Sequence, residues 1–216
     1  MIRRLRRHGA GHRPGQALVE MAMVLPIFLL LVLGTLEFGI AFDHNLTLEY
    51  ATREGARTGS ALANGSGPLG CGAGQSPNAA TVDNNIIAAV ERVLTSDGSP
   101  IKLANVTEIR IYWVDNDPLG GINTNGTETP GTVNRWIPGF TAAVSGSLPS
   151  PDLDFAADPA VQGWPACSRT NGVNADSIGV SVRYTYNLQT SLGALLSVVD
   201  FQMRDHTVMA LNPTGK

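Results

Sequence analysis

Two carboxylates stand at the ends of a long apolar stretch, and they are the side chains with the clearest chemical demand. Residues 17–42 read ALVEMAMVLPIFLLLVLGTLEFGIAF, in which Glu20 and Glu37 are the charged residues. An ionised carboxylate held at the middle of a membrane costs roughly 2–3 kcal/mol. Glu37 lies near one end of the stretch, where its side chain can reach the interface. Glu20 lies about one turn inside the other end, where a carboxylate needs a cation as its partner.

Catalytic and metal-binding patterns are weaker. Ser99-Pro100-Ile101-Lys102 matches Ser-x-x-Lys but lacks the companion motifs of penicillin-binding enzymes. Asp115–Gly120 resembles the start of a calcium loop, but Gly126 stands where the bidentate glutamate belongs, so a polar turn is the simpler interpretation. The histidines are scattered and make no zinc spacing: His8, His12, His44 and His206. We therefore expect no enzyme activity, no metal and no cofactor.

The N-terminal stub is strongly basic. Residues 1–15 contain five arginines and no acid, a net charge of +5, whereas residues 16–216 contain 10 basic and 18 acidic residues, a net charge of −8. Arginines beside an apolar span hold that end in the cytoplasm. A nucleic-acid-binding arm is the alternative, but this arm runs directly into an apolar stretch of bilayer length.

The apolar stretch is long enough to cross a membrane. Residues 17–42 number 26 and extend about 39 Å as a helix, against a hydrocarbon core of roughly 30 Å. A cleaved secretory signal is the rival interpretation, but it has a shorter apolar region that ends in a small-x-small site. Here Gly34-Thr35-Leu36 and Gly39-Ile40-Ala41 are followed by further helical sequence. The pattern favours an uncleaved single-pass span.

A glycine-glutamate pair joins the stub to the span. Gly15-Gln16-Ala17-Leu18-Val19-Glu20 places the glycine after the arginines and the glutamate five residues later. This arrangement resembles the processing site of type IV prepilins. Residues 13–60 are similar to one branch, the TadE-like pilus-assembly proteins of the tight-adherence (Flp pilus) system. Besides Gly15–Glu20, the residues that carry this resemblance are Pro26, Glu37-Phe38-Gly39 and Ala51-Thr52-Arg53-Glu54-Gly55-Ala56-Arg57.

The resemblance implies that a membrane-embedded prepilin peptidase cuts after Gly15 and leaves Gln16 as the new N-terminus. Glycine suits such a cut because an aspartyl protease needs an unhindered, extended backbone, and Pro14 disfavours helix before it. Glu20 would then pair with the new amine of a neighbouring subunit or with its own. The expected protein is a pseudopilin-like subunit of the bacterial cytoplasmic membrane. Its partners would be the membrane, the peptidase, and other pilin-like subunits or copies of itself, with no nucleic acid and no small-molecule substrate.

Two other classes share this topology. A membrane-tethered extracytoplasmic binding module or enzyme would use the helix only as an anchor, and a sensor or secretion-accessory protein would look alike. The mature N-terminus separates them, since a tether begins at Met1 or, if cleaved as a signal, beyond residue 41.

The chain divides into a basic leader over 1–15, a helix with its extension over 16–62, and an extracytoplasmic domain over 63–216. Ala51, Gly55 and Gly59 recur at a spacing of four and form one smooth stripe. Such a stripe packs closely either on the protein's own domain or on another subunit, and the sequence leaves both open.

Hydrophobic periodicity predicts an α+β domain. A helix is expected over 80–95 and strands over 106–114, 178–186 and 200–211, with 115–176 mostly loop and 192–199 a short helix or membrane-facing turn. A small antiparallel sheet of three strands against the long N-terminal helix is also the pilin-like architecture.

Both cysteines, Cys71 and Cys167, lie beyond the span. In an oxidising compartment an isolated pair usually forms a disulfide. This disulfide would close a loop of nearly a hundred residues and contribute about 4–5 kcal/mol in the chain-entropy model. Two free thiols are the alternative.

Overall fold

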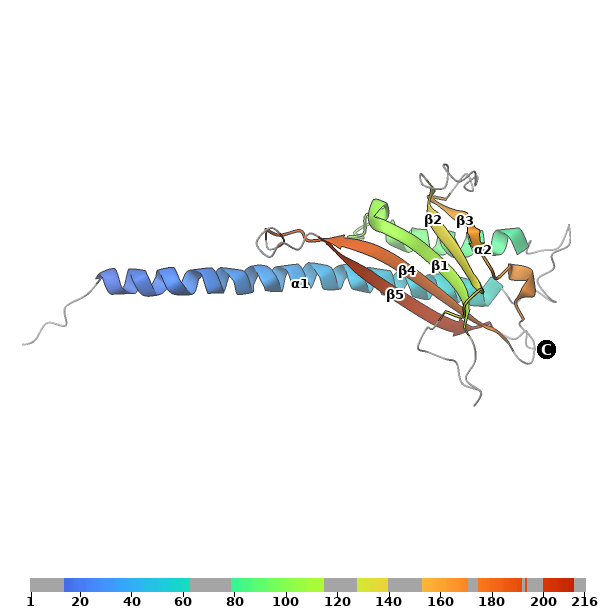
Figure 1. The fold of residues 1–216 in the computed structure, drawn as a ribbon, viewed down its shortest axis with the longest axis horizontal. Coiled ribbons are helices and arrows are strands. Elements are labelled where there is room, and N and C mark those ends of the chain that lie inside the picture. Colours follow the sequence, from blue (N-terminus) through green and yellow to red (C-terminus); the bar gives the residue numbers. More distant parts are fainter. Residues whose placement is uncertain are drawn as a thin grey trace, which may run out of the picture.

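The computed structural model describes residues 14–62, 79–114, 128–139, 153–170, 175–191, 193 and 200–211. One long helix carries, along its C-terminal half, a domain in which a second helix and a five-stranded antiparallel sheet pack together (Figure 1). The α+β class predicted from the sequence is confirmed.

Helix α1, Pro14–Leu62, is the axis of the molecule. It contains 49 residues and is therefore roughly 74 Å long. Its first half stands clear of the domain and its second half lies along it (Figure 1). Pro26 lies inside the free half and leaves one helical hydrogen bond unmade. The helix ends at Leu62, as the sequence predicted.

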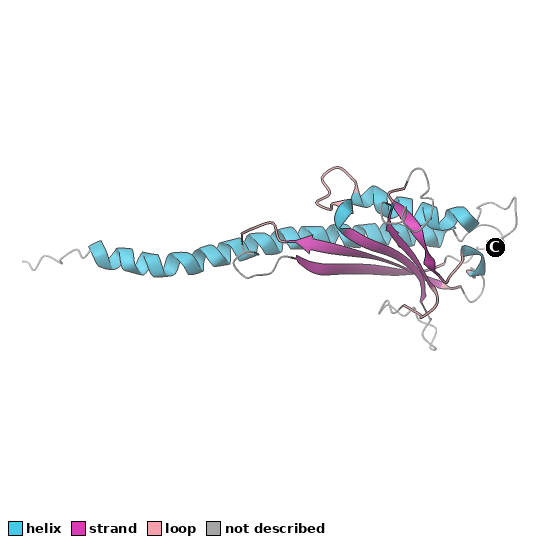
Figure 2. Ribbon diagram, turned by 45° about the horizontal axis from the view of Figure 1, so that its top comes forward, coloured by secondary structure: helices cyan, strands magenta, loops and turns pink. Residues whose placement is uncertain are grey.

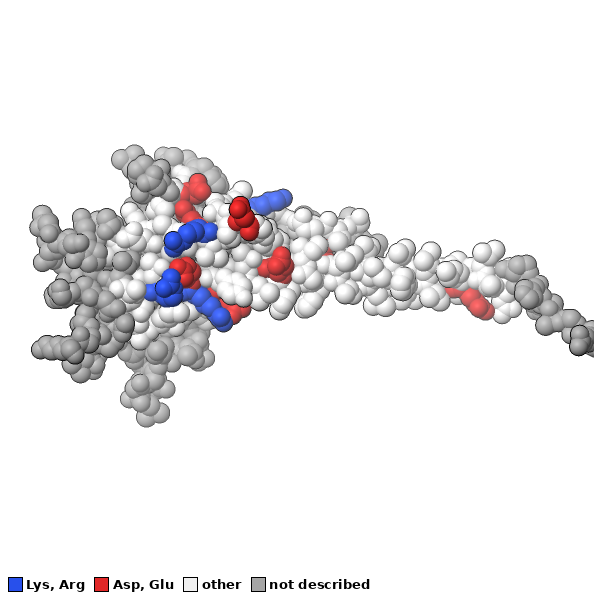
Figure 3. All heavy atoms as spheres, turned by 180° about the vertical axis from the view of Figure 1, so that it is seen from behind, with Lys and Arg blue, Asp and Glu red and all other residues white. Residues whose placement is uncertain are grey.

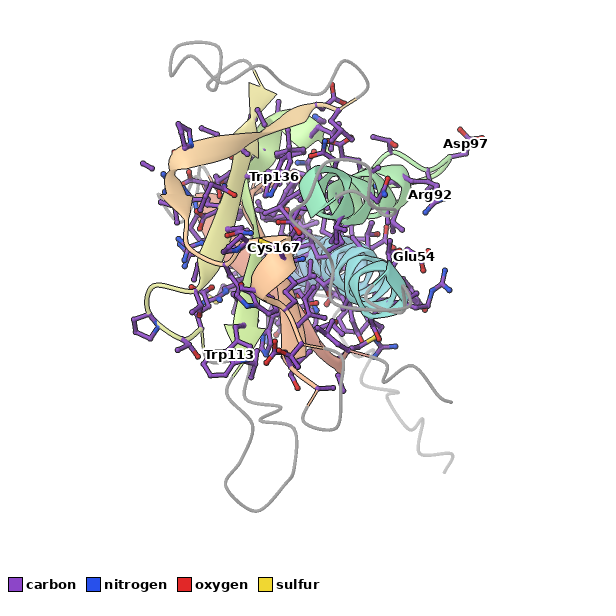
Figure 4. All side chains as sticks on the ribbon, turned by 90° about the vertical axis from the view of Figure 1, so that its right-hand side faces the viewer. Glu54, Arg92, Asp97, Trp113, Trp136 and Cys167 are labelled. Atoms are coloured by element: carbon purple, nitrogen blue, oxygen red, sulfur yellow. The ribbon has the colours of Figure 1, made fainter. Side chains whose placement is uncertain are left out.

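Helix α2, Ala79–Leu94, packs beside α1 through an apolar face. Val82, Ile86, Val90 and Leu94 recur at helical spacing, and all four are buried. Seen from the end that is far from the free half of α1, the two helices lie side by side on one face of the sheet (Figure 4). We call this end of the domain the distal end.

The sheet has the strand order β3-β2-β1-β4-β5, and every neighbouring pair is antiparallel (Figure 2). Its strands are β1 (Val106–Val114), β2 (Val133–Pro138), β3 (Phe155–Gln162), β4 (Ser177–Asn187) and β5 (Asp200–Ala210). Two short 3-10 helices, η1 (Leu103–Asn105) and η3 (Ala166–Ser168), flank them. The β4–β5 hairpin points toward the free half of α1 (Figure 1), with Asn187 opposite Asp200 at that end.

Strand β4 supplies the centre of the core. Its residues alternate between the two faces of the sheet, as the sequence predicted, and those that face the helices are exposed by 2% or less. These residues are Ile178, Val180, Val182, Tyr184 and Tyr186.

Two glycines allow α1 to approach α2 and β4 closely. A Cβ on Gly55 would lie 2.6 Å from Cγ2 of Val90, and a Cβ on Gly59 would lie 2.7 Å from Cδ1 of Ile178. Both distances are shorter than real carbon contacts, so a side chain at either position would require the neighbouring core side chains to move. Ala51, one turn earlier, is fully buried. In this structure the stripe of small residues packs on the chain's own domain.

The prediction that 115–176 is mostly loop was wrong in part, because this region contains β2 and β3. The sheet therefore has five strands instead of three. Both strands carry a proline, Pro138 at the end of β2 and Pro159 within β3. A proline argues against a strand unless the strand lies at an edge, and β3 is an edge strand of this sheet.

The face of the sheet turned away from the helices carries a ladder of charges. Glu108 on β1 binds Arg110 and Arg183, each at 2.9 Å. Further pairs join neighbouring strands and the segment before β2: Arg110–Glu128, Arg204–Glu128 and Arg135–Asp158. Several of these side chains are partly exposed, so each pair adds little stability. The ladder mainly fixes which face of the sheet is polar.

A buried ion pair closes the distal end. Arg169 contacts Asp83 of α2 at 2.6 Å, and its guanidinium lies 4.4 Å from the ring centre of Trp164. Asn134 of β2 donates to Asp83 at 2.8 Å and accepts a hydrogen bond from the backbone N–H of Trp164 at 2.8 Å. Removing one partner of such a pair typically costs about 3–5 kcal/mol.

Helix α2 also carries a buried carboxylate, Glu91. The backbone N–H of Phe155 donates to its Oε1 at 3.0 Å. Burial, the largest influence, raises the pKa of Glu91 from 4.5 to about 7. The folded protein therefore holds this proton at pH values where the unfolded chain has lost it.

Stability should consequently fall with rising pH through this group. The contribution of protonated Glu91 is fully present below pH 4.5 and is lost as the pH approaches 7. We expect the free energy of unfolding to fall by up to about 3 kcal/mol across this window, and Glu91→Gln to remove that fall. Thermal unfolding of the detergent-solubilised protein at several pH values measures it, with the partly exposed Glu49→Gln as the control. A Glu91→Gln protein that loses as much stability as the parent would contradict the assignment.

Candidate functional site on the long helix

The N-terminal end of α1 brings Gly15, Gln16 and Glu20 onto one exposed helical turn. The side-chain amide of Gln16 donates to Oε1 of Glu20 at 3.2 Å. No heavy atom lies within 4 Å of the position that a Cβ on Gly15 would occupy. Packing within the described chain therefore gives no reason for glycine at position 15, in contrast to Gly55 and Gly59.

The free half of α1 is apolar on every side. Residues 15–32 are all exposed, and no charged residue lies between Glu20 and Glu37. From the helix side, this segment is uncharged apart from acidic atoms near its N-terminal end (Figure 3). Polar side chains there bond internally, since the hydroxyl of Thr35 donates to the carbonyl of Leu31 at 2.8 Å. α1 is the one helix among the described residues that is long and apolar enough to cross a membrane.

Glu37 is the first buried residue along α1. Its carboxylate accepts hydrogen bonds from the hydroxyl of Tyr186, from the backbone N–H of Gln189 at 2.9 Å and from that of Thr190 at 2.8 Å. These donors lie at the end of β4 and just after it. Glu37 thus binds the end of β4 and the residues that directly follow this strand.

The sequence interpretation of Glu37 as a carboxylate reaching the interface was incomplete. The side chain is only 6% exposed, because the end of β4 folds over it. The sequence carries no local signal for this pairing, since Glu37 and Tyr186 are 149 residues apart. The contact forms only in the folded domain, where the end of β4 packs against α1.

An aromatic cluster lies one to two turns beyond Glu37. His44 is buried between Tyr184 and Tyr186, with ring centres 5.5 Å and 5.0 Å away. Its Nδ1 has no hydrogen-bond partner among the described residues. Burial is the main influence and lowers the pKa of His44. Neutral His44 therefore belongs to the packing of α1 on β4.

Two hydroxyl groups bind α1 to β5 farther along. Thr52 contacts the carboxylate of Asp205 and, at 3.0 Å, the hydroxyl of Thr207. Ser60 donates to the backbone carbonyl of Ala210 at 2.7 Å. Together with Glu37, these contacts follow the hairpin from the end that points toward the free half of α1 to its distal end.

Some sequence predictions fall outside the described residues. Cys71 is among them, so the disulfide to Cys167 remains a proposal; Cys167 lies on η3 at the distal end (Figure 4). The possible calcium loop over 115–126 and most of 192–199 are likewise not described. Within the described ranges, no group of three or more His, Cys, Asp or Glu side chains could hold a metal.

The architecture defines a class of protein. One long apolar helix, exposed over its first half and carrying an α+β domain on its second, indicates a single-pass membrane protein.

Residues 15–57 match the model of the TadE-like protein family, so this part of the chain is similar to that family. This match confirms the resemblance inferred from the sequence and supports a role connected with Tad pili. No curated protein and no solved structure matches the chain.

The contacts of Glu37 make a direct prediction. Glu37→Ala leaves the buried hydroxyl of Tyr186 and two backbone N–H groups without their acceptor, which costs about 1–3 kcal/mol for each donor left unpaired. We expect faster hydrogen exchange at the amides of Gln189 and Thr190 and a lower unfolding temperature. Exchange mass spectrometry checks the first expectation locally.

The matched control is Glu49→Ala on the same helix. Glu49 forms an exposed ion pair with Arg53, so its loss should change stability little. Unchanged exchange at Gln189 in the Glu37 variant would show that the carboxylate does not hold the end of β4.

Proposed function

We propose that this protein is a pseudopilin-like subunit that takes part in assembling Tad (Flp) pili. The basic leader lies in the cytoplasm, α1 crosses the cytoplasmic membrane and the domain folds on the outer side. A prepilin peptidase removes residues 1–15, and the processed subunit acts through packing rather than catalysis. The observation that carries this proposal is the exposed turn Gly15-Gln16-Glu20 at the start of an uncharged span within a TadE-like segment.

The surroundings of Gly15 support processing. No heavy atom of the described residues surrounds the position that a Cβ on Gly15 would occupy. The absence of a side chain therefore favours access by the peptidase and is not needed for packing. Gly15 also lies in the first turn of α1. The first four N–H groups of a helix have no intrahelical partner, so this turn opens into the extended form that a protease needs at little cost.

The position of Glu20 supports a role in assembly. After cleavage the amine of Gln16 lies one turn before Glu20, at the edge of the membrane. Two unit charges 4 Å apart attract by about 4 kcal/mol at an effective dielectric constant of 20. Glu20 is exposed, so its carboxylate is open to the amine of a neighbouring subunit as well as to its own.

Five arginines before the span support the orientation, because positively charged flanks stay in the cytoplasm. The tethered enzyme or binding module is the rival. A tether needs only length and hydrophobicity from its helix, whereas this helix also supplies buried residues to the core of its own domain.

The mature N-terminus tests processing. We expect protein purified from the membranes of a host with a working prepilin peptidase to begin at Gln16. Gly15→Leu should abolish the cut and leave the full leader, with Met1 as the N-terminus, because a side chain now blocks the scissile backbone. N-terminal sequencing by mass spectrometry reads out both results.

Gly34→Leu is the matched control, because a Cβ at Gly34 also meets no heavy atom within 4 Å. It should be processed normally. A wild-type protein that still carries residues 1–15 would refute the proposed cut.

The role of Glu20 has its own test. Glu20→Ala should insert and be processed normally but reduce piliation by about tenfold or more, since tenfold requires only 1.4 kcal/mol of the pairing energy. Counting pili by electron microscopy measures the effect, and Glu49→Ala serves as the control for losing a partly exposed carboxylate elsewhere on the same helix. Normal piliation with Glu20→Ala would remove the proposed pairing.

A further inference from the structure

The position of Glu37 constrains where the bilayer can lie. The carboxylate holds two backbone N–H groups beside the end of β4, and the polar pair Asn187 and Asp200 closes the hairpin at that level. Strand ends and the open edge of a sheet are not found in hydrocarbon, because their backbone groups would lack partners. The hydrocarbon core must therefore end at or before Glu37.

The length of the free helix agrees with this boundary. Ala17 to Leu36 comprises 20 residues and rises about 30 Å, which matches a typical hydrocarbon core. The 26-residue span expected over 17–42 is therefore too long. Its last part belongs to the domain, since Ile40 and Ala41 pack against the core.

Aromatic side chains surround this boundary and point away from the core. Phe38 is 73% exposed and Phe42 is 54% exposed, one turn apart on α1. Phe201 of β5 is 41% exposed and packs on Tyr186 at 4.9 Å between ring centres. Because Tyr186 also bonds Glu37, Phe201 lies near the same level as Phe38.

We propose that the membrane-facing end of the domain, with Phe38, Phe42 and Phe201, rests in the headgroup layer of the bilayer. The occupant of this surface is lipid, because Phe38 and Phe42 continue directly from the lipid-exposed span and Phe201 of β5 lies beside Tyr186 at the same level. Phe38 lies about 3 Å and Phe42 about 9 Å beyond Leu36 along the helix. The headgroup region is about 5–8 Å thick on each side, so both rings fall in it or at its outer edge.

The protein therefore has no spacer between membrane and domain. Glu37 marks the boundary, and the hairpin end makes a second contact with the bilayer beside the helix. This proposal requires membrane insertion but not cleavage after Gly15, so an uncleaved N-terminus would leave it intact.

Fluorescence quenching by brominated phosphatidylcholine tests the proposal in full-length protein reconstituted into vesicles. Tryptophan is introduced separately by Phe38→Trp, Phe201→Trp and Tyr50→Trp. Tyr50 is 61% exposed on the same helix but lies about 21 Å beyond Leu36, clear of the headgroups. The parent protein supplies the background of Trp113, Trp136 and Trp164. Trp113 lies toward the distal end of the sheet, and Trp136 lies at its middle, opposite Ile109.

Lipid brominated near the glycerol end of its acyl chains should quench the tryptophans at 38 and 201 more than the one at 50. Their emission should also lie to the blue of that from position 50. Phe28→Trp, within the span, reports insertion and should be quenched most by lipid brominated deeper in the chains.

Equal quenching at positions 50 and 201 would overturn the proposal. So would protection of positions 38 and 201 that disappears when the protein is diluted in lipid, because that result would show that a second copy covers them. Quenching that is independent of dilution supports lipid as the occupant.

Discussion

The position of the domain along its own membrane helix depends on one buried carboxylate, that of Glu37. Glu37 stands where the apolar part of α1 ends, and it accepts hydrogen bonds from the end of β4 and from the residues just after it, 149–153 residues along the chain. An unpaired carboxylate in this position would be costly, and so would unpaired N–H groups at the end of β4. The carboxylate supplies the acceptor that the N–H groups need, and the N–H groups supply the donors that the carboxylate needs. The same contact therefore stabilises the end of the sheet and fixes its position along the helix.

The two halves of helix α1 lie in different surroundings. Over its first half, lipid accepts apolar side chains on every face, so the sequence there has no polar stripe. Over its second half, residues such as Leu48 and Ala51 are buried in protein, while Arg53 and Arg57 face water and pair with glutamates on their own helix. The pattern of charge along one continuous helix thus records which surroundings each turn occupies.

Local patterns predicted much of this fold. The limits of α1, α2, β1, β4 and β5 follow closely from hydrophobic periodicity. Strands β2 and β3 were not predicted because their prolines and short apolar runs are typical of loops. β2 is a strand because it pairs with β1, and β3 because it pairs with β2. The spacing of Gly55 and Gly59 indicated close packing but not the partner, which depended on how the domain returns to the helix. The residues proposed for processing, Gly15 and Gln16, were identified from the sequence because their signal is local and faces outward.

The union of helix and domain leaves no hinge between them. α1 runs unbroken from Pro14 to Leu62, and contacts at Glu37, Thr52 and Ser60 bind the hairpin along its second half. If α1 moved along its axis, these contacts would carry the sheet with it. A rise of one helical turn, about 5.4 Å, would lift the whole sheet by the same amount and pull its lower end from the bilayer.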